Sequence, residues 1–290
     1  MKSRISVFNI LNIALFVLLM VICLYPFYYV IIYSVSLPSE APKALLLPKG
    51  FSLQTYQTIL LLNDIKGAFA VSVLRTVLGT VITIFATSFL AYLMTKQEMF
   101  GKKVLYRFII ITMYLNAGLI PWYLTMRAYG LKDNFLLYIL PGAVSAYYMI
   151  LIKTYMESLP PALEESARID GAGIGRIFFS IVLPLSKPII ATIAIYAAVG
   201  QWNTWTDNYF LVNSPNLQTL QMILYNYLNQ AQNMANVSLV SLTSGSNAVK
   251  ITPMSIKMCI TVLVTIPIMC VYPFLQRYFV KGIMMGAVKG

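Results

Sequence analysis

The sequence predicts an all-α integral membrane protein with six transmembrane helices. Its 290 residues are 59% hydrophobic and only 10% charged, whereas a soluble domain is typically about 25% charged. Reading from one charged residue to the next gives six long uncharged segments, five of which hold 19 or 20 residues. A helix rises about 1.5 Å per residue and needs roughly 20 residues to cross the hydrocarbon core. Because that core offers no water to the backbone, each segment is expected to be helical.

The six expected helices follow these uncharged segments in order along the chain. They lie near residues 9–33, 70–95, 105–126, 135–156, 188–210 and 256–279. A cleaved signal peptide is the alternative for the first, but its apolar run from Ile13 to Ile32 exceeds the usual length of about 7 to 15 residues. The uncharged stretch 208–249 contains eight Asn and four Gln, and burying so many amides in lipid is too costly. We therefore expect an extracellular loop there, with some helix near 217–231.

The positive charges indicate which side of the membrane each loop occupies. With the N-terminus inside, thirteen of the 21 Lys and Arg residues fall in cytoplasmic segments and the other eight fall outside. Lys and Arg favour the cytoplasmic side in short loops, and the outer loops are longer in total. We therefore expect both termini in the cytoplasm. The formal net charge of +12 is then a topology signal rather than a nucleic-acid-binding surface.

Several catalytic and cofactor-binding chemistries do not fit the composition. The chain has no histidine, which excludes Ser-His-Asp and Cys-His catalysis and the commonest transition-metal ligand. Its three cysteines, Cys23, Cys259 and Cys270, lie in apolar runs, which favours buried thiols over disulfides or a metal site. No Gly-x-x-x-x-Gly-Lys-Ser/Thr phosphate-binding loop is present. We expect no catalytic residue, metal or cofactor in this chain.

The cytoplasmic loop 157–187 carries much of the polar information in the sequence. A Pro-Pro pair near its start suits a helix N-terminus, and Glu164 and Glu165 in the next turn favour the positive end of the helix dipole. Gly171 is a natural stop because glycine adopts the left-handed conformation without a Cβ clash. An amphipathic turn follows, so the loop is predicted to form helix, glycine bend, helix. It is either a solvated linker or, given its clustered Phe and Ile residues, a docking surface for a partner.

Part of this loop resembles the EAA loop of bacterial ABC-importer permeases. The residues Glu165-Ser-Ala-Arg-Ile-Asp-Gly171-Ala and the downstream Ile-Val-Leu-Pro184 match its consensus, with Ser166 in place of the first alanine of the Glu-Ala-Ala triplet. The segments 277–282 and 286–290 are similar to the C-termini of the smaller permease subunit of maltose-type carbohydrate importers. These subunits belong to the family of binding-protein-dependent transport system inner membrane components. The resemblance covers nearly the whole chain and implies the type I ABC importer permease fold.

The resemblance also implies how the chain is divided. Residues 1–69 would form the N-terminal transmembrane helix and the first extracellular loop. Residues 70–280 would form the permease core of five helices, which includes the coupling loop 157–187 and the extracellular loop 210–255. Residues 281–290 would form a cytoplasmic C-terminal tail. The extracellular loops would either contact a solute-binding protein or simply be solvated.

In the family, the EAA loop forms a coupling helix that inserts in a cleft of a separate ATP-binding subunit. The resemblance therefore implies a non-catalytic permease subunit in the bacterial inner membrane, with ATP bound by the partner and an oligosaccharide as substrate. The implied partners are a second permease subunit, two ATP-binding subunits and an extracellular solute-binding protein. Glu165 is the candidate for an ion pair in the cleft, whereas Arg168 and Asp170 are equally suited to pairing within the loop. The implied ATPase-coupling residues are Glu164, Glu165, Ala167, Arg168, Asp170 and Gly171, with Lys281 and Lys289 as weaker candidates in the tail.

Aromatic and amide side chains mark two stretches that suit sugar recognition, since rings pack on pyranose faces and amides bind hydroxyls. The outer half of the fifth expected helix carries Trp202, Asn203 and Trp205, and the third carries Asn116 and Trp122. An interfacial aromatic belt is the alternative, because tryptophan gathers at membrane surfaces whatever the ligand. This alternative is favoured for Trp205. The five residues are our candidates for the substrate pathway.

The alternative function is a self-contained secondary transporter or channel driven by an ion gradient. Such proteins commonly carry ionisable side chains within the membrane, where an unpaired charge is costly and survives chiefly for function. The expected helices contain no acid deeper than Asp207, which sits at the outer end of the fifth. This favours the ATP-driven importer.

Overall fold

The protein is described by a computed structural model that covers residues 7–61, 63–233 and 252–287. Helices and their connections make up the described residues, together with one isolated antiparallel bridge between Ser36 and Phe51. The chain divides into two compact units, residues 1–65 with 224–267 and residues 66–223 with 268–290. Three helices contribute to both units: α3 (Asn63–Thr95), α12 (Leu220–Asn233) and α13 (Pro253–Ala287).

The first unit is built around the end of α1 (Val7–Val35), which is followed by η1 (Ala41–Lys43) and α2 (Gln54–Leu61). Tyr33, near the end of α1, packs with Ala41 and Met258. The most apolar 18-residue window of α1 has none of its residues buried. A helix of this length with apolar side chains all round suits a lipid environment.

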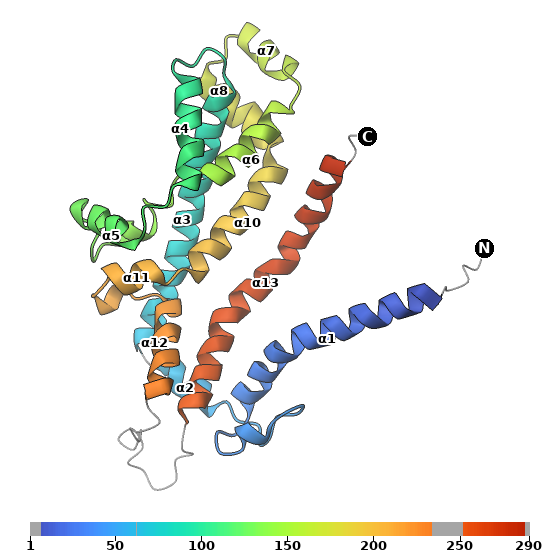
Figure 1. The fold of residues 1–290 in the computed structure, drawn as a ribbon, viewed down its shortest axis with the longest axis vertical. Coiled ribbons are helices and arrows are strands. Elements are labelled where there is room, and N and C mark those ends of the chain that lie inside the picture. Colours follow the sequence, from blue (N-terminus) through green and yellow to red (C-terminus); the bar gives the residue numbers. More distant parts are fainter. Residues whose placement is uncertain (1–6, 62, 234–251, 288–290) are drawn as a thin grey trace. The chain divides into compact units, whose positions relative to one another are not determined.

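The second unit contains the remaining helices. In chain order these are α4 (Lys102–Tyr114), α5 (Leu119–Ala128), η2 (Phe135–Tyr138), α6 (Ala146–Glu157), α7 (Ala162–Ile169), α8 (Ile174–Ile177), the π-helical turn η3 (Phe178–Val182), α9 (Leu183–Leu185), α10 (Lys187–Asn203), α11 (Thr206–Leu211) and η4 (Pro215–Leu217). Within this unit, α7 and α8 lie at one end of α3, α4, α6 and α10, whereas α5 and α11 lie toward the other end (Figure 1).

Helix α3 takes part in two hydrophobic clusters of the second unit. Near α7, Tyr92 of α3 is buried together with Ile152 of α6 and Phe178 of η3. Toward the other end, Val71 of α3 is buried in a cluster that includes Leu211 of α11. One long helix therefore runs along the core of the unit from one cluster to the other.

Three helices among the described residues are long and apolar enough to cross a membrane: α1, α3 from Asp64, and α13 as far as Cys270. They correspond to the helices expected near 9–33, 70–95 and 256–279. The segment from α8 to α9 meets α10 at a bend of 82°. If these two parts are taken as one span, they add a fourth crossing. The expected count of six transmembrane helices is therefore not confirmed.

The other three expected helices are interrupted. The one near 105–126 is divided into α4 and α5 by residues 115–118, where Gly118 has a φ of 83° and the Asn116 side chain accepts its N–H at 2.9 Å. With a ψ of 177° the backbone of Gly118 is not helical, so the helix cannot continue through this residue, and α5 begins directly after it. The absence of charge predicted the length of the apolar segment correctly but carried no information about this break.

The same kind of correction applies to the two remaining segments. The helix expected near 135–156 consists of η2, a turn that contains Pro141, and α6. Proline has no N–H to donate and disfavours a helical conformation in the residue before it. The helix expected near 188–210 consists of α10 and α11, which are separated at Thr204. The helix expected near 217–231 corresponds to α12.

Candidate functional sites

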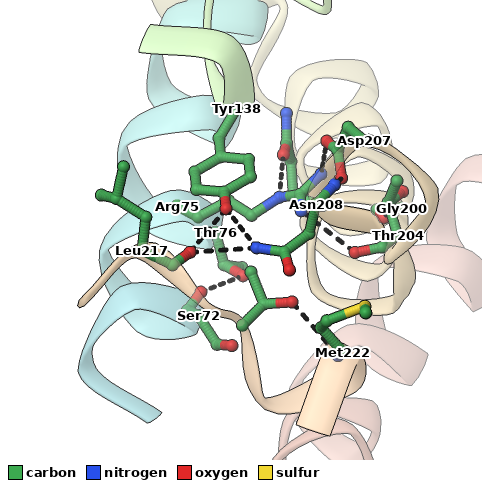
Figure 2. Close-up of polar contacts among 12 residues, drawn as sticks. Ser72, Arg75, Thr76, Tyr138, Gly200, Thr204, Asp207, Asn208, Leu217 and Met222 are labelled. Atoms are coloured by element: carbon green, nitrogen blue, oxygen red, sulfur yellow. Dashed lines mark hydrogen bonds and ion pairs between the residues drawn. The ribbon is translucent and has the colours of Figure 1, made fainter. Parts of the chain in front are cut away.

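The second unit buries an ion pair between Arg75 of α3 and Asp207 of α11 (Figure 2). Arg75 Nη2 donates to Asp207 Oδ2 at 2.6 Å, and Nη1 donates to Oδ1 at 3.1 Å. Arg75 is only 3% exposed and Asp207 only 8%. A bidentate arginine–carboxylate pair of this kind is strong and geometrically specific. Arg75 is therefore held inside the protein, although charge counting along the sequence assigned it to an extracellular flank.

The break between α10 and α11 supplies further acceptors for Arg75. Its Nε donates to Gln201 Oε1 at 3.1 Å, and its Nη1 donates to the Thr204 carbonyl oxygen at 3.0 Å. The guanidinium carbon also lies 4.6 Å from the ring centroid of Tyr138, within the range of a cation–π interaction. The helix break thus exposes a backbone carbonyl that the buried arginine satisfies.

Helix α3 satisfies the backbone of a second break in the same way. The hydroxyl of Thr83 donates to the Gly142 carbonyl oxygen at 2.8 Å, and that of Thr87 donates to the Ala143 carbonyl oxygen at 3.3 Å. Both carbonyls belong to the turn between η2 and α6. In an unbroken helix these carbonyl groups would accept backbone N–H groups of the same helix. At the break, hydroxyl groups of α3 take the place of those donors.

A second set of hydrogen bonds joins η2 to the chain after α11. Asn208 Nδ2 donates to the Leu217 carbonyl oxygen at 3.0 Å and is also hydrogen-bonded to the Tyr138 hydroxyl. The Tyr138 hydroxyl donates to the same carbonyl at 2.5 Å. The Ser72 hydroxyl oxygen accepts the N–H of Leu220 at 2.8 Å. The segments around the ion pair are consequently fixed to one another (Figure 2).

Asp133, in the loop before η2, fixes that loop to the segment after α11. Its carboxylate accepts the backbone N–H groups of Asn213 at 2.5 Å and Ser214 at 2.8 Å. These two donors favour the ionised form, so the pKa of the Asp133 carboxyl lies below its ordinary value. The residue has a φ of 53°, a conformation that aspartate tolerates better than most side chains.

A cavity of about 320 Å³ adjoins the ion pair. Aromatic and polar side chains share its wall, among them Thr83, Trp122, Tyr138, Tyr148, Gln201 and Asp207. Gln201 is positioned by a close approach of two helices, because a Cβ atom on Gly79 of α3 would lie 2.7 Å from Gln201 Cδ. A side chain at position 79 would therefore require the amide of Gln201 to move from its place.

One of the five candidate pathway residues, Trp122, lines this cavity. Trp202 is instead buried, in edge-to-face contact with Phe69 at a centroid distance of 6.3 Å. Trp205 is half-buried, and its ring lies 5.8 Å from that of Tyr209. Trp122 and Trp205 therefore occupy different surroundings, and the cavity involves only the first of them.

The two candidate asparagines lie outside the cavity wall. Asn203 is exposed and accepts a hydrogen bond from Gln221 Nε2 at 3.1 Å. Asn116 is exposed within the break between α4 and α5. Sequence reasoning missed Arg75 and Tyr138. The one available signal was the charge of Arg75, which lies inside the expected helix 70–95, a segment longer than one membrane crossing requires.

At the other end of the unit, α7 is attached to the turn between α3 and α4. Glu164 pairs with Lys96, and Arg168 Nη1 lies 2.7 Å from Glu98 Oε1. Hydrogen bonding to Glu98, together with its negative charge, raises the pKa of the Arg168 guanidinium. Lys96 Nζ also lies 4.0 Å from the ring centroid of Tyr92. Arg168 therefore finds its partner in the α3–α4 turn rather than within the loop.

The opposite face of α7 is free of such contacts in the described structure. Glu165 and Asp170 are exposed, and Ile169 is 86% exposed. Ala167 lies on the inner side, where it packs against the hydrophobic cluster around Tyr92. The helix thus has an inner face that contacts its own chain and an outer face that carries an exposed isoleucine between acidic residues.

Gly171 ends α7 in the expected manner. Its φ is 78°, the Gly171 N–H donates to the Arg168 carbonyl oxygen at 3.0 Å, and the Ala172 N–H donates to that of Ala167 at 2.9 Å. These two bonds form a Schellman motif, in which glycine is the preferred residue. The predicted helix and glycine bend are present, followed by α8, η3 and α9.

We expect Gly171→Val to lower transport while membrane insertion stays normal. Valine in a left-handed conformation costs about 1–3 kcal/mol, and this strain acts locally because no atom lies within 4 Å of a Cβ at this position. Transport and abundance in membranes are the measurements. Gly173→Val is the matched control, since Gly173 also has no atom within 4 Å and has an ordinary φ of −72°. Normal transport by the Gly171 variant at normal abundance would contradict the expectation.

The tail candidates are only partly covered by the structure. Lys281 belongs to α13, and Lys289 lies outside the described residues. Part of the expected extracellular loop 210–255, residues 234–251, also lies outside them. The roles of both segments stay predictions.

The apolar helices and the partly polar cavity suit a membrane protein that binds or conducts a solute. The chain belongs to the family of binding-protein-dependent transport system inner membrane components, whose model matches residues 79–285. The family resemblance found from the sequence is thereby confirmed, and the chain is a permease subunit of a binding-protein-dependent transport system.

Several named relatives are similar over nearly their whole length. The polygalacturonan/rhamnogalacturonan transport system permease protein YtcP of Bacillus subtilis (strain 168) is 36% identical over 292 residues, covering 100% of both chains. Protein LplC of the same organism is 35% identical over 288 residues, covering 98% of this chain and 95% of that protein. A crystal structure of a bacterial ABC transporter involved in the import of the acidic polysaccharide alginate matches with a TM-score of 0.85 at 31% identity, covering 96% of this chain and 99% of that chain.

Proposed function

We propose that this chain forms half of the translocation pathway of an ABC importer for oligosaccharides. In this proposal it crosses the membrane six times with both termini in the cytoplasm. A second permease subunit supplies the other half, two separate subunits bind and hydrolyse ATP, and an extracellular protein delivers the sugar. The chain itself is not catalytic. The names of the relatives, which refer to polygalacturonan, rhamnogalacturonan and alginate, support a sugar substrate.

The hydrogen bonds at the helix breaks support the six proposed membrane crossings. Irregular backbone is tolerated within a membrane only where protein or a water-filled cavity surrounds it. Arg75 and Thr83 of α3 hydrogen-bond the carbonyl groups of Thr204 and Gly142 at two of the breaks, beside the cavity. The pairs η2 with α6 and α10 with α11 are therefore suited to cross the membrane as interrupted helices. For α4 with α5 the proposed crossing rests on the uncharged segment 108–126.

The main support for a coupling role is that one face of α7 packs on its own chain while the other face is exposed. Its inner face is attached to the α3–α4 turn by two ion pairs, and its outer face presents Ile169 at 86% exposure. An exposed apolar side chain flanked by acids suits insertion in a cleft of the ATP-binding subunit. Glu165, on the exposed side, remains the candidate for the ion pair with that subunit.

The same contacts indicate how motion of α7 reaches the cavity. Lys96, directly after α3, pairs with Glu164, and Arg75 within α3 pairs with Asp207. A helix that connects positions 75 and 96 is roughly 30 Å long. In this proposal α3 transmits displacement of α7 to the break between α10 and α11, in addition to the direct covalent connection of the loop to α6 and α10.

ATP-driven uptake by the assembled importer in proteoliposomes tests the proposed function. Uptake should disappear when the phosphate-binding lysine of the ATPase subunits is replaced, and Ile169→Asp should release those subunits during purification. Phe100→Asp is the matched control, because Phe100 is fully exposed in the α3–α4 turn outside α7. Uptake driven by an ion gradient with this chain alone would instead establish a secondary transporter.

A further inference from the structure

We propose that the cavity beside Arg75 is a binding subsite for one uncharged sugar ring, a proposal that rests on the proposed function. Its volume of about 320 Å³ lies at the lower end of the range for ligand pockets. Residues of α3, α5, α6 and α10 contribute to its wall, together with the break after η2. The cavity is thus formed largely by the interrupted helices.

The apolar part of the wall offers aromatic surface. Trp122 and Tyr148 line the cavity, and both are half-buried, so part of each side chain remains accessible. Tyr138 also lines the cavity, but the guanidinium of Arg75 lies over its ring at 4.6 Å. The rings of Trp122 and Tyr148 are therefore the surfaces available to the C–H face of a pyranose, which is apolar and packs on aromatic side chains.

The charged groups of the wall neutralise each other. The nitrogens of Arg75 donate to Gln201, Thr204 and Asp207, and both carboxylate oxygens of Asp207 accept from Arg75. An anionic ligand would have to separate a buried, bidentate ion pair to reach the arginine, which is costly. The cavity consequently favours a ligand without charge.

The remaining hydrogen-bonding capacity suits hydroxyl groups. Gln201 uses its Oε1 to accept from Arg75, which leaves the two N–H donors of its amide for a ligand. Thr83 donates its hydroxyl proton to Gly142 and keeps oxygen lone pairs as acceptors. The amide nitrogen of Gln201 and the hydroxyl oxygen of Thr83 thus offer donors and an acceptor in a small neutral cavity, which suits the hydroxyl groups of a sugar.

The amide of Gln201 is fixed before any ligand arrives. Gly79 approaches it so closely that a Cβ would lie 2.7 Å from Gln201 Cδ, and a Cβ on Gly142 would lie 3.5 Å from its Nε2. Arg75 holds the other end of the amide. A donor positioned in this way binds without a further loss of side-chain freedom.

In this proposal the cavity binds the hydroxyl groups of the sugar and does not bind its carboxylate groups. The names of YtcP and of the alginate importer refer to acidic polysaccharides, yet the cavity holds no unpaired cation among its described lining residues. In an importer of this kind, the subsite of this chain would recognise the ring and its hydroxyl groups. Any selection for carboxylates would occur elsewhere along the pathway.

Protection of an engineered cysteine tests the subsite in the assembled importer. The three native cysteines are replaced by serine, and Thr204→Cys places one thiol at the cavity wall. Its reaction with a methanethiosulfonate reagent, without ATP, is followed by the mass of this chain. Methyl β-D-galactopyranoside should slow the reaction in a saturable way, whereas sodium galacturonate at equal concentration should not. Thr125→Cys, on the exposed surface of α5 and outside the cavity wall, is the matched control and should react at the same rate throughout.

Two further substitutions show whether the ligand uses the proposed contacts. Trp122→Leu and Gln201→Leu, each combined with Thr204→Cys, should raise the galactoside concentration needed for half-protection by about fivefold. Trp122→Leu leaves the Arg75–Asp207 pair intact, so it remains informative if the Gln201 variant does not assemble. The subsite is refuted if the galactoside gives no protection, if galacturonate protects equally well, or if Trp122→Leu leaves protection unchanged. Because ATP is absent, a failure of ATP-driven uptake would refute the proposed function without affecting this result.

Discussion

Replacing Asp207 with leucine is expected to destabilise the protein by about 3–5 kcal/mol, because it leaves the charge of Arg75 buried without its partner. Arg75 is only 3% exposed, so little of its guanidinium is hydrated in the folded protein. Its contacts with Gln201 and the Thr204 carbonyl are dipolar and do not replace a carboxylate. Thermal unfolding of the purified protein in detergent, together with its abundance in membranes, measures the effect.

The double variant Arg75→Met with Asp207→Leu is the control for this prediction. Removing both charges should recover most of the lost stability, since a buried ion pair is often no more stabilising than apolar residues of similar volume. Recovery should be incomplete by about 1–3 kcal/mol, because the Thr204 carbonyl loses its donor. Equal stability of Asp207→Leu and the wild type would show that Arg75 is not enclosed as described.

Reversing the charge of Lys96 by Lys96→Glu is expected to reduce ATP-driven uptake by about tenfold, a change of roughly 1.4 kcal/mol in activation free energy. The substitution places a second negative charge beside Glu164 in the partly buried contact that attaches α7 to the end of α3. Repulsion between them should separate α7 from α3 while the ATPase subunits still bind its outer face. Uptake should therefore fall more than ATP hydrolysis does, and both rates are measured in proteoliposomes.

The reciprocal exchange, Lys96→Glu with Glu164→Lys, restores opposite charges and should return uptake to within about threefold of the wild type. Exchange of Lys153 and Glu157, an ion pair between successive turns of α6, provides the matched control. It should change uptake much less than Lys96→Glu does, because an i,i+4 pair within one helix contributes only about 0.2–0.5 kcal/mol and joins no two helices. Failure of the reciprocal exchange, with normal complex assembly, would argue against transmission through this contact.

The parts of the fold that sequence reasoning predicted well are those set by local chemistry. The apolar composition predicted α1, α3 and α13, because helix formation in lipid depends on a continuous run of apolar side chains. The prolines, acidic first turn and Gly171 predicted α7 and its end, because capping depends on residues a few positions apart. The helix breaks near Gly118 and Thr204 were missed, since neither position carries a charge.

The buried site was harder to predict for a different reason. Arg75 and Asp207 are separated by 132 positions in the sequence, and nothing local to either residue indicates that they meet. Charge counting treated each as the polar boundary of a membrane span, and this gave no indication that the two charges neutralise each other inside the protein. Among the candidate pathway residues, Trp122 lines the cavity and Trp202 packs in the core, and their aromatic chemistry alone gave no means of telling the two apart.

The π-helical turn η3 makes the length of the loop after α7 as important as its composition. Such a turn contains one residue more than a turn of α-helix. Two of its residues pack on α3: the ring centroid of Phe178 lies 5.3 Å from that of Phe89, and that of Phe179 lies 6.0 Å from that of Phe85. Losing one residue from this segment would rotate everything downstream, including α10, by about 100°. Evolution of this loop should therefore proceed by exchanging side chains and should avoid insertions and deletions, so that homologous genes keep a constant spacing between Gly171 and Pro184.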